Sequence, residues 1–217
     1  EARRRRGGIR VLVPLCGKTV DLTHFAMHDG VAEVVGVDGV SKALEEFASE
    51  NPTLGLKKVH PTNSSTNDND DDDNDNGPFD RWEGNNIVLL KGDFFDLTPE
   101  AAGGTFDAVW DRGSLVAIPP DSRSEYLDVT ERLMKPGGTM LISTVDRREG
   151  TEEGREDGPP FSLSGGDVRE LYGSRTGWVD SVSTIDEFDE CGDPRGRERW
   201  NAKGLMSVFE VISVVKA

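Results

Sequence analysis

The sequence predicts an α/β fold built on a doubly wound, mostly parallel sheet. Short apolar runs of strand length alternate with segments of helical period along most of the 217 residues. The runs at 9–13, 34–38 and 106–109 each lead into a short polar or glycine-containing string. Because parallel strands end at one shared edge, we expect the loops after these runs to build a site there.

The first fifty residues predict a βαβα unit. Ile9–Val13 is a strand, and Thr19–Met27 repeats its apolar side chains at helical spacing. A second strand runs from about Glu33 to Asp38. A helix follows over Lys42–Glu50, and we expect Ser41 to be its N-cap. Such a unit implies parallel strands with a right-handed crossover.

Residues 51–86 interrupt this pattern. The stretch 63–76 contains only Asn, Asp, Ser and Thr, so it cannot bury enough apolar surface to become ordered. A calcium loop of the EF-hand type needs a glycine at the turn and a terminal glutamate, and both are absent. We expect a disordered Asp-rich insertion at about residues 60–80, with Phe79 and Trp82 packing the chain back onto the domain.

The remaining elements complete the predicted sheet. The chain continues with three strand-like runs and a helix near 122–133, which ends at a Lys-Pro-Gly-Gly breaker. A further strand, a last helix and two closing strands follow. Their ranges are 87–90, 92–96, 106–110 and 139–145 for the first strands, 167–172 for the last helix, and 179–185 and 207–215 for the closing strands. Two closing strands without a helix between them predict an antiparallel hairpin. We therefore expect one Rossmann-like domain over residues 1–217, with an antiparallel C-terminal hairpin.

The composition excludes several classes of partner. The net charge is −16, and it would still be −10 without the six aspartates between Asp68 and Asp75. This balance opposes nucleic-acid binding, and we interpret Arg3–Arg6 as a solvated tail. No apolar run approaches the ~18 residues of a membrane span, nor is there a signal-peptide pattern. We expect a cytoplasmic monomer that binds neither nucleic acid nor membrane.

The cysteines and histidines do not indicate a disulfide framework or a metal site. There are two cysteines, Cys16 and Cys191, and three histidines, without metal-ligand spacing. Cys16 lies in the first strand-to-helix loop, where a nucleophile is conceivable, but no histidine is marked as its base. We interpret it as a small, partly buried loop residue and expect no metal.

The first loop favours an adenosine ligand without a phosphate cradle. A dinucleotide site requires G-x-G-x-x-G, whereas this loop offers only Gly17, and a P-loop fails because Leu12 occupies its first glycine position. Asp38 follows Gly17 by about twenty residues, where a carboxylate can accept from both ribose hydroxyls. The alternative for Asp38 is a loop or capping role.

Two further strand ends complete a pocket of nucleoside type. Asp93 and Phe94 offer a polar edge and an aromatic face for a base, while we assign Phe95 to the core. Asp111 and Arg112 directly follow a buried run. They could form a structural salt bridge, but their place at the strand ends favours a site role. Together these loops point to a methyl-transferring enzyme.

Seven short motifs carry a resemblance to a known family. They are PLCGK at 14–18, GVD at 36–38, GN at 84–85, FDL at 95–97, FD at 106–107, WDRG at 110–113 and GPPF at 158–161. In order and spacing they resemble the thiopurine S-methyltransferase family, over about residues 9–217 apart from the Asp-rich insertion. PLCGK, WDRG and GPPF are specific in combination.

The resemblance implies S-adenosylmethionine as cofactor, S-adenosylhomocysteine as product and a small thiol or other soft nucleophile as acceptor. The cofactor contacts expected at the matching positions are Leu15, Cys16, Gly17, Asp38, Asp93, Phe94 and Arg112, and the acceptor contacts are Pro160, Phe161 and Arg199. In-line methyl transfer needs orientation more than a base. Arg112 or Arg199 could hold an anionic acceptor, with Asp111 as an alternative proton acceptor.

The chain departs from the family pattern in three places. Asp38 stands where glutamate is common, Lys203–Leu205 replaces a Trp-Gly-hydrophobic string, and only Glu1–Gly8 precede the first strand, where the family has a longer cofactor cover. Either the chain is a fragment or the cofactor is more exposed. The alternatives are a halide, thiocyanate, selenium or tellurium methyltransferase, a non-catalytic S-adenosylmethionine-binding module, and a nicotinamide dehydrogenase, which the missing glycine pattern disfavours.

Overall fold

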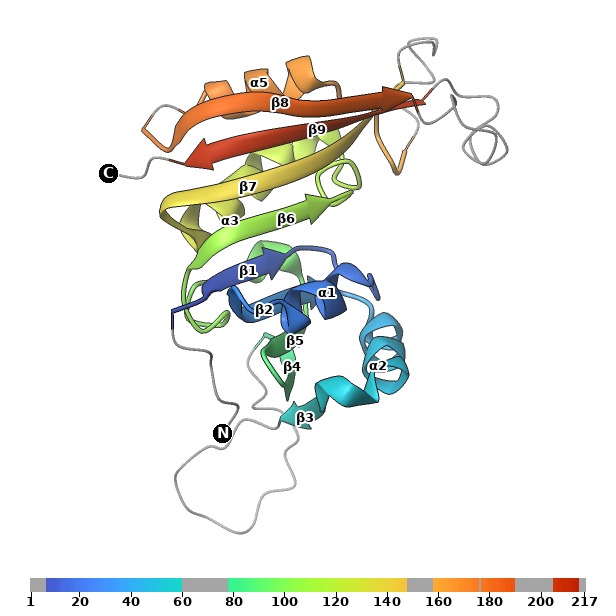
Figure 1. The fold of residues 1–217 in the computed structure, drawn as a ribbon. Helices are drawn as coiled ribbons and strands as arrows, with labels where there is room; N and C mark the ends of the chain where they lie inside the picture. The colour runs from blue at the N-terminus through green and yellow to red at the C-terminus, as the bar shows by residue number, and fades with distance from the viewer. Residues whose placement is uncertain (1–6, 60–77, 148–157, 176, 190–204, 215–217) are drawn as a thin grey trace. The chain divides into compact units, whose positions relative to one another are not determined.

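The computed structural model describes residues 7–59, 78–147, 158–175, 177–189 and 205–214 (Figure 1). The chain divides into two compact units, residues 1–104 and residues 105–217. The expectation of one domain stays a prediction. Within the described ranges, no helix is long and apolar enough to cross a membrane.

The first unit contains a sheet with the strand order β3-β4-β5-β2-β1. β1 (Ile9–Val13), β2 (Val31–Asp38) and β5 (Ile87–Lys91) pair in parallel. β3 (Lys57–Val59) and β4 (Asp80–Gly84) extend the sheet beyond β5 in antiparallel fashion. The parallel strands are almost continuously buried, as expected where layers cover both faces of a sheet.

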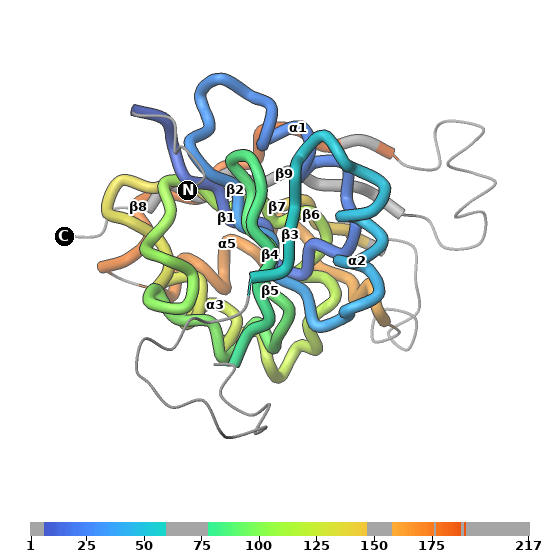
Figure 2. The backbone as a smooth tube through the Cα atoms, turned by 90° about the horizontal axis from the view of Figure 1, so that it is seen from below, coloured from blue at the N-terminus to red at the C-terminus, as the bar shows by residue number. Residues whose placement is uncertain are grey.

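Two helices cover one face of this sheet (Figure 2). α1 (Asp21–Met27) packs on β2, and α2 (Ser41–Glu50) packs on β2 and β5. The expectation that Ser41 is the N-cap of α2 is wrong. Ser41 is the first helical residue, and Val40 precedes it without a capping side chain. The turn begins earlier because Asp38 Oδ1 accepts the Val40 N–H at 2.8 Å.

The sequence did not predict β3 and β4, which flank the expected insertion. Residues 60–77, where most of that insertion falls, lie outside the described residues. The prediction that Phe79 and Trp82 pack the chain back onto the domain after the insertion is confirmed. Trp82 is buried, and a Cβ added to Gly92 would lie only 2.4 Å from the Phe79 ring.

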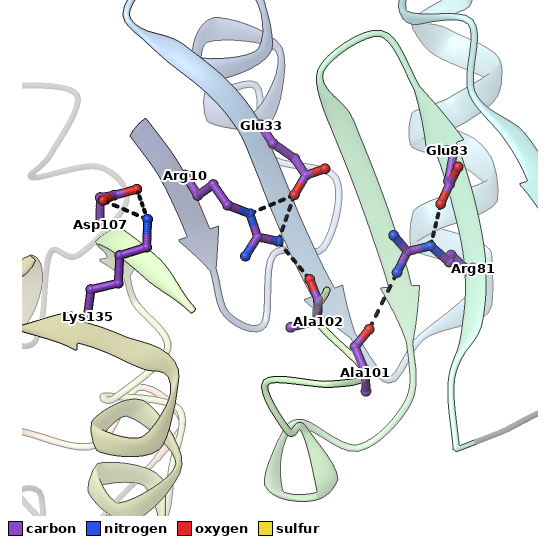
Figure 3. A network of polar contacts seen from close by, with 8 residues as sticks. All are labelled: Arg10, Glu33, Arg81, Glu83, Ala101, Ala102, Asp107 and Lys135. Atoms are coloured by element: carbon purple, nitrogen blue, oxygen red, sulfur yellow. Dashed lines mark hydrogen bonds and ion pairs between the residues drawn. The ribbon is translucent and has the colours of Figure 1, made fainter. Parts of the chain in front are cut away.

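A buried ion pair joins the two parallel strands at the start of this unit (Figure 3). Arg10 of β1 donates from Nε and Nη2 to Glu33 Oε2 of β2 at 2.8 and 2.6 Å. Its Nη2 also donates to the carbonyl of Ala102 at 2.7 Å. This arrangement satisfies both charges and anchors the turn near residue 102 to β1.

The second unit contains a sheet with the strand order β6-β7-β9-β8. β6 (Phe106–Arg112) and β7 (Met134–Arg147) pair in parallel. β9 (Leu205–Val214) pairs antiparallel with both β7 and β8 (Val179–Asp189). The predicted antiparallel C-terminal hairpin is therefore confirmed.

Within the described residues of this unit, two α-helices accompany the sheet. α3 (Arg123–Leu133) buries the predicted inward face, and α5 (Gly165–Gly173) packs against β8 and β9. A capping box begins α5, in which Ser164 Oγ accepts the Asp167 N–H at 3.2 Å and Asp167 Oδ2 accepts the Ser164 N–H at 2.7 Å. At the start of β6, Lys135 pairs with Asp107 at 2.8 Å (Figure 3).

Candidate active site

Three strand ends of the first unit are joined around Asp38. The Gly17 N–H, in the loop after β1, donates to Asp38 Oδ2 at 2.7 Å. The Cys16 N–H donates to the Val37 carbonyl at 3.0 Å, and the Gly92 N–H after β5 donates to the Asp38 carbonyl at 3.1 Å. The predicted residues of the first and second strand ends are thus brought together, and the third strand end adjoins them.

The loop after β1 has an uncommon backbone. Leu15 has φ 43° and Gly17 has φ 49°, both in the left-handed region. A Cβ at Gly17 would contact nothing within 4 Å, so the backbone angle rather than space favours glycine there. For Leu15 this conformation carries strain, of a kind that often accompanies binding sites. The turn directs the Gly17 N–H to Asp38.

The Cys16 side chain packs between this loop and Gly36 of β2. A Cβ added to Gly36 would lie 2.8 Å from Cys16 Sγ and 3.0 Å from Leu22 Cδ2, so the thiol fills the space over a glycine of β2. Burial raises the pKa of the Cys16 thiol, and the Asp38 charge raises it further. A neutral, enclosed thiol favours the packing interpretation over a nucleophile.

Asp93 and Phe94 lie just after the strand end that Gly92 joins to Asp38. Asp93 is exposed, and its Oδ1 accepts the Phe95 N–H at 3.0 Å. This bond starts a 3-10 turn over Phe94–Asp96, where the sequence predicted a strand. The assignment of Phe95 to the core is wrong because the turn buries Phe94 instead and leaves Phe95 half-buried.

Asp111 at the end of β6 is a buried hydrogen-bond acceptor. Its Oδ1 accepts the Ser114 N–H at 2.7 Å and the Leu115 N–H at 3.1 Å, and its Oδ2 accepts the Tyr126 hydroxyl at 2.8 Å. Burial raises the pKa of the Asp111 carboxyl, while these hydrogen bonds lower it. The arrangement fixes the turn after β6 and favours a structural role over proton transfer.

Arg112 and the Gly158–Phe161 motif lie on the surface of the same unit. Arg112 is exposed at the last position of β6. The Phe161 N–H donates to the Val116 carbonyl at 2.7 Å, which joins this motif to the segment after β6. Pro160 is half-buried beside it. Arg199 lies outside the described residues.

Sequence reasoning missed two features of α3, one of which reaches this site. The helical spacing placed Tyr126 in the core, but nothing in it indicated that the hydroxyl bonds Asp111. It also gave no reason to single out Arg123, whose side chain is buried. Both features depend on how α3 packs, which periodicity alone does not specify.

Comparison of the sequence with known proteins gives a consistent result. A family model for thiopurine S-methyltransferase matches residues 1–208. The thiopurine S-methyltransferase of Nitrosospira multiformis is 34% identical over 203 residues, covering 93% of this chain and 80% of that protein. The one of Pseudomonas paraeruginosa is 35% identical, covering 87% and 74%, and the one of Bos taurus is 32% identical, covering 84% and 66%.

Solved structures also resemble the chain. An arsenic(III) S-adenosylmethionine methyltransferase from Chlamydomonas reinhardtii superposes with a TM-score of 0.59 at 17% identity, over 99% of this chain and 65% of that chain. The DhpI–SAH complex superposes with a TM-score of 0.56 at 16% identity, over 98% and 81%. At such identities the likeness concerns the fold, and it confirms the Rossmann-like architecture.

Proposed function

The chain belongs to the thiopurine S-methyltransferase family, and from this premise we propose that it transfers the methyl group of S-adenosylmethionine to the sulfur of a small aromatic thiol. The observation that carries the proposal is the junction of three strand ends at Asp38. Loops in this position form the ligand site of open α/β sheets.

The residues around Asp38 fit the adenosine part of that cofactor. Each carboxylate oxygen of Asp38 accepts one backbone N–H and keeps a lone pair for a ribose hydroxyl. The half-buried side chain remains accessible. Asp93 and Phe94 follow the neighbouring strand end, and we propose the exposed Asp93 as a polar contact and the largely buried Phe94 ring as an aromatic contact for the base. Leu15, Cys16 and Gly17 contribute the adjoining loop.

Arg112 is our candidate for the acceptor side. When bound, S-adenosylmethionine supplies a methyl group activated on a sulfonium, so the protein mainly has to orient and desolvate the partners. An aromatic thiol reaches the site as the thiolate, and a guanidinium at the end of β6 stabilises that charge. We also propose Arg112 as a cofactor contact, with Pro160, Phe161 and Arg199 bordering the acceptor.

Asp111 has a different role in this proposal. Its carboxylate is buried and accepts hydrogen bonds from the Ser114 N–H in the turn and from the Tyr126 hydroxyl in α3. It therefore holds the turn beside Arg112 and does not take a proton from the acceptor. This assignment needs no dedicated base, because the thiolate forms without one.

The comparisons do not favour the alternatives of a halide, thiocyanate, selenium or tellurium methyltransferase, a non-catalytic module or a dehydrogenase. The small aromatic thiol is the acceptor class we propose. The monomeric state and the cytoplasmic location stay predictions.

The test compares three acceptors that differ in one atom, namely thiophenol, phenol and aniline, with labelled S-adenosylmethionine. We expect S-methylation of thiophenol to dominate. Arg112→Ala should lower thiophenol turnover by roughly 10²-fold, and should lower the thiophenol-to-aniline ratio, because a neutral amine gains little from the guanidinium. Arg132→Ala, an exposed arginine of α3, is the control. Equal rates on the three acceptors would contradict the proposal.

A further inference from the structure

The turn after β6 is held by a phenol that none of the sequence motifs includes. Tyr126 lies in α3, fifteen residues beyond Asp111, and its hydroxyl donates to Asp111 Oδ2 at 2.8 Å. Tyr126 is fully buried and Asp111 is 1% exposed. The bond therefore joins a helix to a strand end in an environment without competing water.

The other Asp111 contacts lead back to the turn. Oδ1 accepts the Ser114 N–H at 2.7 Å, and both oxygens approach the Leu115 N–H, at 3.1 and 3.2 Å. A carboxylate with these donors sets the path of the chain from β6 into residues 113–115. Arg112 lies between Asp111 and this path, so its backbone is held on both sides.

The electrostatics support donation from the phenol to an ionised carboxylate. Burial raises the pKa of Asp111, and the bond from Tyr126 is the first of the interactions that lower it. Burial also raises the pKa of Tyr126, as does the Asp111 charge, so the phenol keeps its proton. Burial raises the pKa of Tyr172 in α5, and the Asp111 charge raises it further. Arg112 is the neighbouring cation along β6.

We propose that Tyr126 is a positioning residue for methyl transfer, which acts through Asp111 to fix the turn that presents Arg112. The inference rests on the proposed function, since it assigns a purpose to the position of Arg112. Tyr126 itself touches no substrate. Its effect reaches the acceptor through one carboxylate and the backbone of one turn.

Tyr172 provides a matched control. It is also fully buried in the second unit, but its hydroxyl lies 3.5 Å from Met140 Sδ and does not bond Asp111. Tyr126→Phe and Tyr172→Phe each remove one buried hydroxyl from the same unit. A purely structural role would affect both variants alike, whereas positioning affects only the first.

The experiment measures thiophenol methylation by the native protein and both variants across pH. We expect Tyr126→Phe to lower kcat/KM by roughly tenfold or more, the effect of one lost hydrogen bond to a charged group, with S-adenosylhomocysteine affinity within about twofold of native. The acid limb of the plot of kcat/KM against pH should move to higher pH in Tyr126→Phe. Without the hydrogen bond from Tyr126, the Asp111 carboxylate takes up a proton more readily. Tyr172→Phe should leave the acid limb in place.

A second readout needs no turnover. Amide hydrogen exchange at Ser114 and Leu115 should accelerate in Tyr126→Phe at neutral pH and stay at the native rate in Tyr172→Phe. Equal kinetics, pH profiles and exchange rates in the two variants would overturn the inference. Inactivity of the native protein with every thiol would instead contradict the proposed function, and the exchange rates would still decide whether Tyr126 holds the turn.

Discussion

Arg123 presents an unusual charge at the start of α3. The residue is 8% exposed, and its Nε and Nη2 are buried without a hydrogen-bond partner in the part of the chain that the structure describes. Burial lowers the pKa of the guanidinium, and the nearby Asp167 carboxylate raises it. Two guanidinium nitrogens buried without hydrogen-bond partners cost stability.

Replacing this charge should therefore stabilise the protein. Arg123→Met keeps the stem, removes the charge and should raise the free energy of unfolding by roughly 1 kcal/mol. Urea denaturation at neutral pH measures the change. Arg132→Met, on the exposed side of the same helix, should stay within about 0.5 kcal/mol of native. A clear loss of stability in Arg123→Met would show that the guanidinium has a partner in solution.

Single residues also show how far sequence reasoning reaches. The position of Asp38 at the end of β2, beside the Gly17 loop, was predictable because the ends of parallel strands share one edge of a sheet. The hydrogen bond from Tyr126 to Asp111 could not be predicted in this way. Helical spacing indicates which face of a helix is buried, but it does not indicate which group a hydroxyl binds. Phe94 is buried and Phe95 is half-buried, contrary to our assignment of Phe95 to the core, because Asp93 accepts the Phe95 N–H and a 3-10 turn forms where we expected a strand.

Among the elements, β3 and β4 bound the Asp-rich stretch. They pair antiparallel, with Val59 opposite Arg81, so the chain is already joined on both sides of that stretch. Deleting residues 63–76 shortens the connection about threefold, which changes its closure free energy by only about 1 kcal/mol. The thermal midpoint and S-adenosylhomocysteine affinity should stay near native values.

Calorimetry and thermal melting of the deletion variant test this expectation. A variant in which Gly and Ser replace the same residues at equal length separates the effect of composition from that of length. A large drop in the midpoint in both variants would show that the acidic stretch makes a stabilising interaction, such as binding an ion.

The elements that the sequence predicted are those with strong periodicity. The apolar run at 9–13 predicted β1 with its observed bounds, and the two closing strands predicted the antiparallel hairpin. β3 and β4 were not predicted because short, half-exposed strands beside a polar stretch show no clear alternation of apolar and polar residues. The start of α2 was misplaced because Asp38, and not Ser41, organises its first turn.

At the scale of the whole molecule, the family was predictable because its motifs are spread along the chain, and PLCGK, GVD and WDRG among them lie at the ends of β1, β2 and β6. Each motif alone is short, but their order and spacing together follow one architecture, and the family model covers residues 1–208. The proposed cofactor contacts at Asp38 and Asp93 belong to the first unit. The proposed acceptor contacts at Arg112 and Phe161 belong to the second.

The central claim is that the loops joined at Asp38 bind S-adenosylmethionine. Isothermal titration of the native protein with S-adenosylhomocysteine, and separately with NAD, tests it most directly. We predict binding of S-adenosylhomocysteine alone, weakened by about 1.5–3 kcal/mol in Asp38→Ala and unchanged in Asp96→Ala, an exposed carboxylate of the same unit. Binding of NAD without S-adenosylhomocysteine, or native affinity in a folded Asp38→Ala variant, would contradict the account.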